Sequence, residues 1–366
     1  MRSEIHPLRV LVKALVLFLV INIVYALIDP SLGGISAYNH LIPGRVRFPF
    51  GSVNDPYVVM VDNLDVMAAS HRISAPEKTD EYRVVLIGDS SVWGEKISAN
   101  DSISEQWNNL NLQCNGMQIK FYNLGYPHPS IIKDLIVLDK AMQYEPDMIV
   151  WFVTLNTLIP RRLSPFIAAN SEEAAKVLNT YKIPYSQEDE LALSKPSFFE
   201  KTLIGRRSEL ARAIKLQTLG LLWMATGQDK RPSNPAPALS QDVDDDAKFR
   251  GWVPRVKLEN KMVFEALQAG HEMAGSVPIL IVNEPIFIAS GQNSDIRYND
   301  VYPRWAFDQY RELMTSEAQK SRWNYLDLWN AVPDSEFSDT SLHVSAQGER
   351  QLIESINPVL RRIACP

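Results

Sequence analysis

The stretch Arg83–Ser91 (RVVLIGDSS) decides the fold of this chain. Its first five residues are mostly branched and apolar, which predicts a short buried strand. Gly88 and Asp89 then favour a tight turn, because glycine tolerates unusual backbone angles and aspartate bonds to neighbouring amides. A strand that ends in such a turn would present Ser90 at the edge of a sheet.

Strands and helices alternate along much of the remaining chain. Further strands are predicted at 118–122, 148–153, 278–282 and 324–328, and helices at 102–112, 130–144, 259–274, 303–319 and 345–363. Strands separated by helices form right-handed crossovers, which build a parallel sheet with helices on both faces. The sequence therefore predicts an α/β fold with a parallel five-stranded sheet between two helical layers.

The third and fourth strands lie roughly 125 residues apart, which no ordinary crossover spans. We therefore expect one domain over 81–366 that carries a large insertion at about 158–258. Residues 208–226 of the insertion have a helical pattern with basic residues beside apolar ones, so this helix either packs on the core or lies at a membrane interface. The polar and acidic residues 227–250 are expected to be mobile.

The N-terminal region predicts a membrane segment. Residues 8–28 are almost entirely apolar, and Arg2, Arg9 and Lys13 lie towards their N-terminal side. With Lys13 extended towards the lipid headgroups, about 20 residues remain, enough to cross a hydrocarbon core of about 30 Å. The basic residues would keep the N-terminus in the cytoplasm and place the main domain outside it.

No A-x-A pattern that would mark signal cleavage surrounds Ala26. We therefore expect residues 1–29 to be a cytoplasmic tail and a transmembrane helix, with a cleaved signal peptide as the alternative. The chain would then be a single-pass membrane protein with the lipid bilayer as a partner. Residues 30–80 hold too many large apolar side chains for a solvated tether and are expected to form an ordered lead-in segment.

The composition excludes several classes of protein. The chain has 366 residues, of which 46% are hydrophobic and 22% charged, as in a folded globular protein. A net charge of -6 argues against a nucleic-acid partner. The only cysteines, Cys114 and Cys365, exclude a cysteine-rich zinc site. Outside the cytoplasm they either form a disulfide or remain unrelated thiols. No metal or other cofactor is expected, because no His/Asp cluster has ligand spacing.

Polar residues follow the predicted strands at the edge where the carboxyl ends of parallel strands meet. Gly125 follows the second strand and Asn156 the third, while Asp339 and His343 precede the last helix. A glycine amide can approach a ligand closely, and an asparagine amide can donate to an oxyanion. Each of these residues could equally be a turn or cap residue.

The serine, glycine, asparagine and histidine, together with the aspartate, appear in the order that characterises the SGNH (GDSL) hydrolase family, which this chain resembles. The resemblance covers roughly residues 80–160 and 278–366. It implies a flavodoxin-like three-layer α/β/α fold with strand order 2-1-3-4-5. It also implies acyl transfer through a serine acyl-enzyme.

The same resemblance implies a role for each matching residue. Ser90 would be the nucleophile and His343 its general base. The amides of Ser90 and Gly125 and the side chain of Asn156 would stabilise the oxyanion. Asp339 would orient the imidazole and stabilise its charged form.

Two departures from the family pattern stand out. The third block usually reads Gly-x-Asn-Asp, whereas this chain has Thr154–Thr157 (TLNT). The aspartate usually lies three residues before the histidine, but Thr340 holds that place and Asp339 lies four before His343. Asp334 and a backbone carbonyl are weaker substitutes for Asp339.

Asn283 and Glu284 follow the fourth strand and are therefore expected to face the same site. We expect them to bind substrate hydroxyl groups, with a surface carboxylate that caps a loop as the alternative for Glu284. His128 also follows the second strand, but its two flanking prolines suit a rigid turn better than a pocket.

The anchor, the outward domain and the insertion resemble family members that move acyl groups onto cell-surface polysaccharides beside a membrane-bound O-acyltransferase. The sequence therefore predicts a membrane-anchored serine esterase or O-acyltransferase that acts on acyl esters of carbohydrate or lipid, with such an acyltransferase as a candidate partner. The altered third block and the shifted aspartate motivate an alternative, a non-catalytic carbohydrate-binding or scaffold subunit of a membrane complex.

Overall fold

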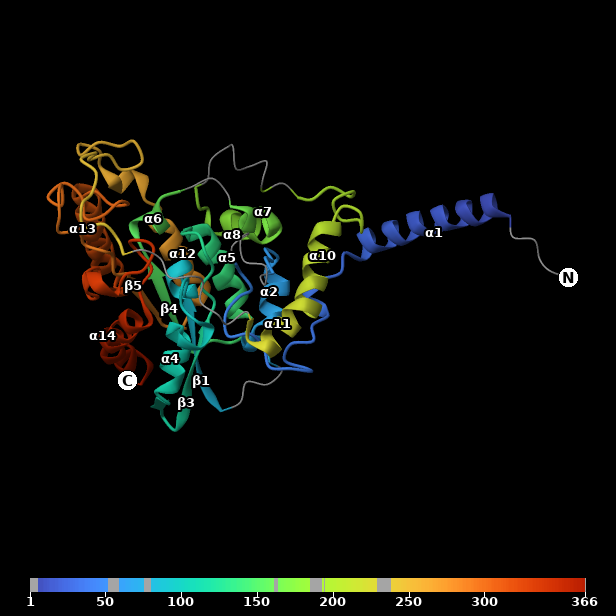
Figure 1. Cartoon of the computed structure of the whole chain (residues 1–366), viewed down its shortest axis with the longest axis horizontal. Coiled ribbons are helices and arrows are strands. Elements are labelled where there is room, and N and C mark those ends of the chain that lie inside the picture. The colour runs from blue at the N-terminus through green and yellow to red at the C-terminus, as the bar shows by residue number, and fades with distance from the viewer. Residues whose placement is uncertain are drawn as a thin grey trace.

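The computed structural model describes residues 6–51, 59–75, 80–160, 164–184, 193, 195–228 and 238–365. Its strands are β1 (Glu81–Ile87), β2 (Gln113–Cys114), β3 (Met117–Asn123), β4 (Met148–Val153), β5 (Ile279–Asn283) and β6 (Asn324–Asp327). They form one sheet in the order β2-β3-β1-β4-β5-β6 (Figure 1). All neighbours pair in parallel except β2, which pairs antiparallel with β3. The predicted five parallel strands are thus confirmed, and the short β2 is an addition at the edge.

The two faces of the sheet are covered by different helices. Val85 and Ile87 of β1 share one apolar cluster with α5 (Ile131–Met142), α12 (Phe264–Ala274) and α13 (Arg304–Ser321). The alternate residues Val84 and Leu86 belong to a second cluster, with α4 (Ile103–Asn109) and α14 (Ala346–Ala364). Because successive strand residues point to opposite faces, this division gives a three-layer α/β/α fold.

Shorter helices lie between these elements and in the insertion. Their bounds are α2 (Leu64–Ser70), α3 (Ser90–Trp93), α6 (Leu155–Leu158), α7 (Pro165–Ala169), α8 (Ser171–Tyr181), α10 (Arg207–Lys215), the π-helical turn η4 (Leu216–Gly220) and α11 (Leu221–Thr226). The helix expected over 208–226 is therefore α10, η4 and α11 in succession. One side of it packs on the domain, since Ala213, Leu216 and Gly220 are buried.

The described part of residues 227–250, which we expected to be mobile, makes specific contacts with the domain. Residues 229–237 lie outside the described residues. Beyond them, the Val243 amide donates to the Gln292 carbonyl, and Arg297 donates to the Asp246 carbonyl at 2.5 Å. Arg297 is buried in the domain, so its hydrogen bond holds this acidic segment against the domain.

The helix α1 (Pro7–Ile28) extends away from the globular body (Figure 1). It has 22 residues with a mean hydropathy of 2.6 over its most apolar window. Of its residues only Asn22 and Ala26 are buried. By length and composition it is the one helix, among the described residues, that is able to cross a membrane.

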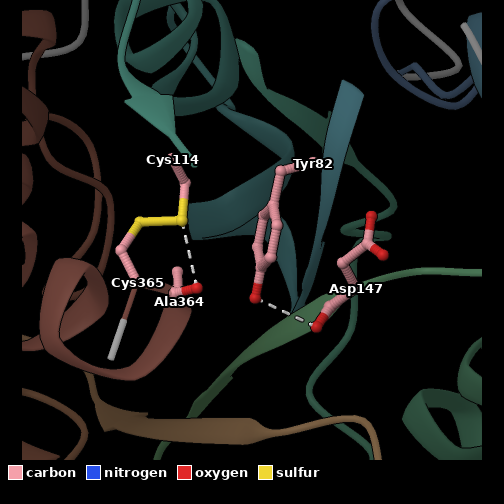
Figure 2. Close-up of a disulfide and its surroundings, with 5 residues drawn as sticks. All are labelled: Tyr82, Cys114, Asp147, Ala364 and Cys365. Carbon is pink, nitrogen blue, oxygen red and sulfur yellow. Dashed lines mark hydrogen bonds between the residues drawn. A yellow bond between two sulfur atoms is a disulfide. The ribbon is translucent and has the colours of Figure 1, made fainter. Parts of the chain in front are cut away.

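A disulfide joins Cys114 and Cys365, with the two Cα atoms 5.6 Å apart, so the two thiols are paired (Figure 2). Cys114 ends β2, at the edge of the sheet, and Cys365 follows α14. The bond therefore fastens the end of α14, which covers one face of the sheet, to the β2–β3 hairpin. It links residues separated by 251 positions in sequence.

We expect the variant C114S/C365S to lose about 2–5 kcal/mol in free energy of unfolding, because a long closed loop restricts the unfolded chain. Urea unfolding of the two proteins under non-reducing conditions measures this difference. A reductant should lower the stability of the wild type and leave that of the variant unchanged. Equal stabilities of the two proteins without reductant would contradict the expectation.

Candidate active site

The turn after β1 places Ser90 at the carboxyl edge of the sheet. A Cβ atom on Gly88 would lie 2.5 Å from Cγ2 of Val92, so the turn packs too tightly for any larger residue. Asp89 is the N-cap of α3, and its Oδ1 accepts the Ser91 amide at 3.0 Å. Ser90 is thus the first helical residue, where an amide has no acceptor within the helix. Its N–H and Oγ are presented together at this edge.

Three side chains form a hydrogen-bonded chain at this edge. The hydroxyl of Ser90 donates to Nε2 of His343 at 2.8 Å, and Nδ1 of His343 lies 2.8 Å from Oδ1 of Asp339. Ser90 is half-buried and His343 is buried. An ionised carboxylate only accepts hydrogen bonds, so the proton of the neutral imidazole is on Nδ1, and Nε2 is left as the acceptor for Ser90.

The local structure explains why the aspartate lies four residues before the histidine. The hydroxyl oxygen of Thr340 accepts the amides of Leu342 and His343, at 3.3 and 3.2 Å. Thr340 therefore closes the turn, and Asp339 is the side chain that reaches the imidazole. Asp334 is exposed and accepts a hydrogen bond from Gln241 instead.

Charge raises the basicity of the imidazole. Burial alone would lower the pKa of His343, but its hydrogen bond to Asp339 and the charge of that carboxylate outweigh burial, so this pKa lies above its ordinary value. Burial would raise the pKa of Asp339, yet the bond from His343 brings that pKa below its ordinary value. The carboxylate of Glu95, which sequence reasoning missed, lies 3.9 Å from Nε2 and adds to the negative charge.

Asn156 lies at the second position of α6, directly after β4. Thr154 is the N-cap of that helix, and its amide donates to the hydroxyl of Thr157 at 3.1 Å in a capping box. The two threonines that replace the glycine and aspartate of the family pattern thus hold the turn that carries Asn156.

An arginine of the insertion orients the Asn156 side chain. Nη2 of Arg250 donates to Oδ1 of Asn156 at 2.9 Å. Because a guanidinium only donates, the atom that faces it must be the amide oxygen, and Nδ2 is left to donate elsewhere. Sequence reasoning missed Arg250, since it lies 94 positions from Asn156 inside the insertion.

The Gly125 amide does not fill its expected role as an oxyanion donor. Its hydrogen goes to Oδ1 of Asn123, at 3.0 Å. A Cβ atom at Gly125 would lie 2.7 Å from the Trp93 nitrogen and 2.9 Å from the Val92 side chain. The glycine is therefore required for close packing of the loops after β1 and β3, while its amide is already satisfied.

Lys133 of α5 is hydrogen-bonded to both of these loops. Its ammonium group donates to the carbonyls of Gly88 and Tyr126 at 2.6 and 2.8 Å, and it pairs with Asp134 at 2.8 Å. The side chain is fully buried. No sequence signal separated it from the other polar residues of this helix.

Asn283 and Glu284 do not face a substrate, which corrects the expectation from their place after β5. Asn283 is buried, with Nδ2 bonded to Asp327 and Oδ1 accepting the Tyr310 hydroxyl. Glu284 is also buried, and its Oε1 accepts the Ser91 hydroxyl at 2.7 Å. Burial and the nearby charge of Asp89 raise the pKa of Glu284. Both side chains are therefore bonded to neighbouring protein groups in the interior, next to the site.

No cluster of three or more metal-ligating side chains is found in the part of the chain that the structure describes. His128, on the loop after β3, is exposed and has a φ of 76°. It lies against Phe50, with the ring centroids 6.3 Å apart, so it belongs to the turn rather than to the hydrogen-bonded chain.

No family model and no curated protein matches the chain. It is similar to solved structures described as a GDSL-like lipase from Bacteroides ovatus (10% identity, TM-score 0.38), a carbohydrate acetylesterase family member from Sinorhizobium meliloti (13%, 0.35) and a lipase/acylhydrolase from Enterococcus faecalis (12%, 0.35). The matches cover 78%, 77% and 77% of this chain, and 55%, 99% and 96% of the respective structures. This chain thus spans only about half the length of the first of them.

The parallel order β3-β1-β4-β5-β6 is the order 2-1-3-4-5 that the family resemblance implied, and the serine and histidine of the first and last blocks meet at its carboxyl edge. The chain therefore has a three-layer α/β/α fold whose strand order is the one that the resemblance to the SGNH hydrolases implied.

We expect the pKa of His343 to lie above about 6.5, the ordinary value for histidine, and D339N to lower it because the stabilising charge is lost. NMR titration of the imidazole measures both values. D334N is the matched control and should leave the titration unchanged.

The same shift has a consequence for stability. Since the folded-state pKa of His343 exceeds its unfolded value, its protonation stabilises the fold below about pH 6.5, and this contribution is lost as the pH rises through the folded-state pKa. In the NMR titration, an equal imidazole pKa in wild type and D339N would contradict the claim that the Asp339 charge raises the pKa of His343.

Proposed function

We propose that this chain is a membrane-anchored serine esterase or O-acyltransferase that acts on acyl esters of cell-surface carbohydrate or lipid. The observation that carries the proposal is the hydrogen-bonded chain from Ser90 through His343 to Asp339. A serine hydroxyl is a weak nucleophile until a base removes its proton, and here the base is already in hydrogen-bonding contact.

The acylation step uses these three residues in order. As Oγ of Ser90 attacks the ester carbonyl, its proton passes to Nε2 of His343. Asp339 holds Nδ1–H and stabilises the imidazolium that forms. The imidazolium then returns the proton to the leaving alcohol, and the acyl group remains on Ser90 as an ester.

The negative charge of the tetrahedral intermediate falls on the former carbonyl oxygen. The Ser90 amide and Nδ2 of Asn156 are the donors that the site offers to it. A preorganised donor of this kind is typically worth about 2.7–4 kcal/mol of transition-state stabilisation. Arg250 has a supporting role, because it fixes which end of the Asn156 side chain faces the intermediate.

Deacylation decides between hydrolysis and transfer. His343 can activate water or an acceptor hydroxyl in the same way, so the outcome depends on which one reaches the acyl-enzyme. In the proposed setting, α1 anchors the chain in a membrane with its N-terminus in the cytoplasm and the domain outside it. Acceptor hydroxyls of a polysaccharide or lipid would lie within reach there, and a membrane-bound O-acyltransferase is a candidate source of acyl groups.

The alternative, a non-catalytic binding or scaffold subunit, was motivated by two departures from the family pattern. Each departure now has a local explanation. The threonines around Asn156 form a capping box, and Thr340 closes the turn from which Asp339 reaches His343. These contacts favour the enzyme.

S90A should abolish turnover of short-chain activated esters and labelling by a fluorophosphonate, because Ser90 carries the hydroxyl that donates to Nε2 of His343. S91A is the matched control. The Ser91 hydroxyl donates to Glu284 and not to His343, so labelling should persist in this variant. Labelling is read by intact mass. Labelling of S90A at the wild-type rate would refute the proposal.

N156A should lower kcat about 10²–10³-fold, as expected for loss of one oxyanion donor. R250A should lower kcat by a smaller factor with KM little changed, and it should have no further effect in the N156A background, because Arg250 acts through Asn156. K248A, two positions away and exposed, is the control with wild-type kinetics. Equal effects of R250A in both backgrounds would show that Arg250 does not act through Asn156.

A further inference from the structure

Exposed large apolar residues are concentrated at one place outside α1. Outside α1, the described residues include eleven exposed large apolar residues. Six of the eleven lie between positions 198 and 222: Phe198, Phe199, Ile204, Ile214, Leu219 and Leu222. We call these six the apolar surface. An exposed apolar surface of this kind usually marks contact with another molecule or a membrane.

The apolar surface adjoins the C-terminal end of α1. The Ile204 amide donates to Oδ1 of Asn22 at 3.1 Å, and Lys201 pairs with Asp29 at 2.6 Å. Arg206 also reaches Asp29 and donates to the Pro30 carbonyl at 3.2 Å. Figure 1 shows α10 and α11 on the side of the body from which α1 leaves.

The contact at Asn22 sets the level of the loop 198–204 along α1. Asn22 lies six residues before Ile28, the last residue of the helix, which corresponds to about 9 Å of helix rise. A bilayer crossed by α1 would therefore reach the loop that carries Phe198, Phe199 and Ile204. The depth agrees with the 5–10 Å to which interfacial helices bury their apolar faces, as a rough guide.

The outer face of α10 to α11 offers water few hydrogen bonds. Ile214 and Leu222 are 61% and 57% exposed, on the side away from the buried Leu216. The hydroxyls of Thr218 and Thr226 on this face donate back to the Ile214 and Leu222 carbonyls, at 2.8 and 2.9 Å. This bonding satisfies the hydroxyls inside the helix, so the face suits lipid better than water.

Basic residues border the same helix. Arg207 and Lys215 are exposed, and Arg212 is half-exposed beside Asp62. Long basic side chains can keep their charge at the headgroups while their methylene stems lie on apolar surface. Cations flanking an apolar helix face are typical of helices that lie in the interface of a membrane with anionic lipids.

We propose that the apolar surface lies in the headgroup region of the membrane that α1 crosses, so that the domain is held against the bilayer at two places. This inference rests on the proposed anchoring of the chain by α1. A single helix would leave the domain free to rotate about its axis. The second contact fixes which face of the domain the membrane covers.

The test uses the full chain in vesicles of phosphatidylcholine and phosphatidylglycerol. I214C and L222C each add one thiol for an NBD fluorophore, because Cys114 and Cys365 are bonded to each other. L110C is the matched control, an exposed leucine at the end of α4, far from α1 (Figure 1). Doxyl-labelled lipids quench a fluorophore only at short range.

NBD at positions 214 and 222 should be quenched by doxyl lipid and protected from aqueous iodide, and NBD at 110 should show the reverse. If the chain resists carbonate extraction but all three positions respond like 110, the proposal is wrong. Protection at 214 and 222 from both quenchers would overturn it in favour of a protein partner. Release of the chain by carbonate would overturn the anchor and this inference together, whereas fluorophosphonate labelling in detergent tests the catalytic site independently.

Discussion

The hydrogen bond between Ser90 and His343 is the interaction on which the account of this protein depends. It joins residues 253 positions apart, at 2.8 Å. Ser90 comes from the turn after the first strand of the sheet, and His343 from the segment before the last helix. The two residues come from opposite ends of the domain, so the site depends on the folded domain as a whole. The Cys114–Cys365 disulfide fastens that last helix, which follows His343, to the edge of the sheet.

Buried contacts explain how the loops after β1 and β3 hold this geometry. Lys133 bonds to the loops after β1 and β3, and Gly125 lets the same loops approach within a distance that a Cβ atom would prevent. Glu284 supports the neighbouring Ser91 from the interior. A buried, fully bonded cation and a buried carboxyl group under one turn limit its motion, and a preorganised site needs little rearrangement during reaction.

The sequence was informative wherever a strong rule applied and silent where packing decided. Parallel strands bring their carboxyl ends to one edge, so the meeting of Ser90 and His343 could be predicted. The direction of a side chain at that edge could not, and Asn283 and Glu284 turned inward. The Gly125 amide was engaged by a neighbour only two residues away. Arg250 and Lys133 act across long separations, which no local pattern reports.

The most direct measurement locates the acyl group itself. The chain is incubated with a short-chain activated ester, quenched in acid and digested, and the peptides are analysed by mass spectrometry. We expect one acyl addition, on the Ser90 side chain, which forms in the wild type and accumulates when deacylation is slow. An acyl group found only on another residue, or an acyl-enzyme that still forms in S90A, would contradict the claim that Ser90 is the nucleophile.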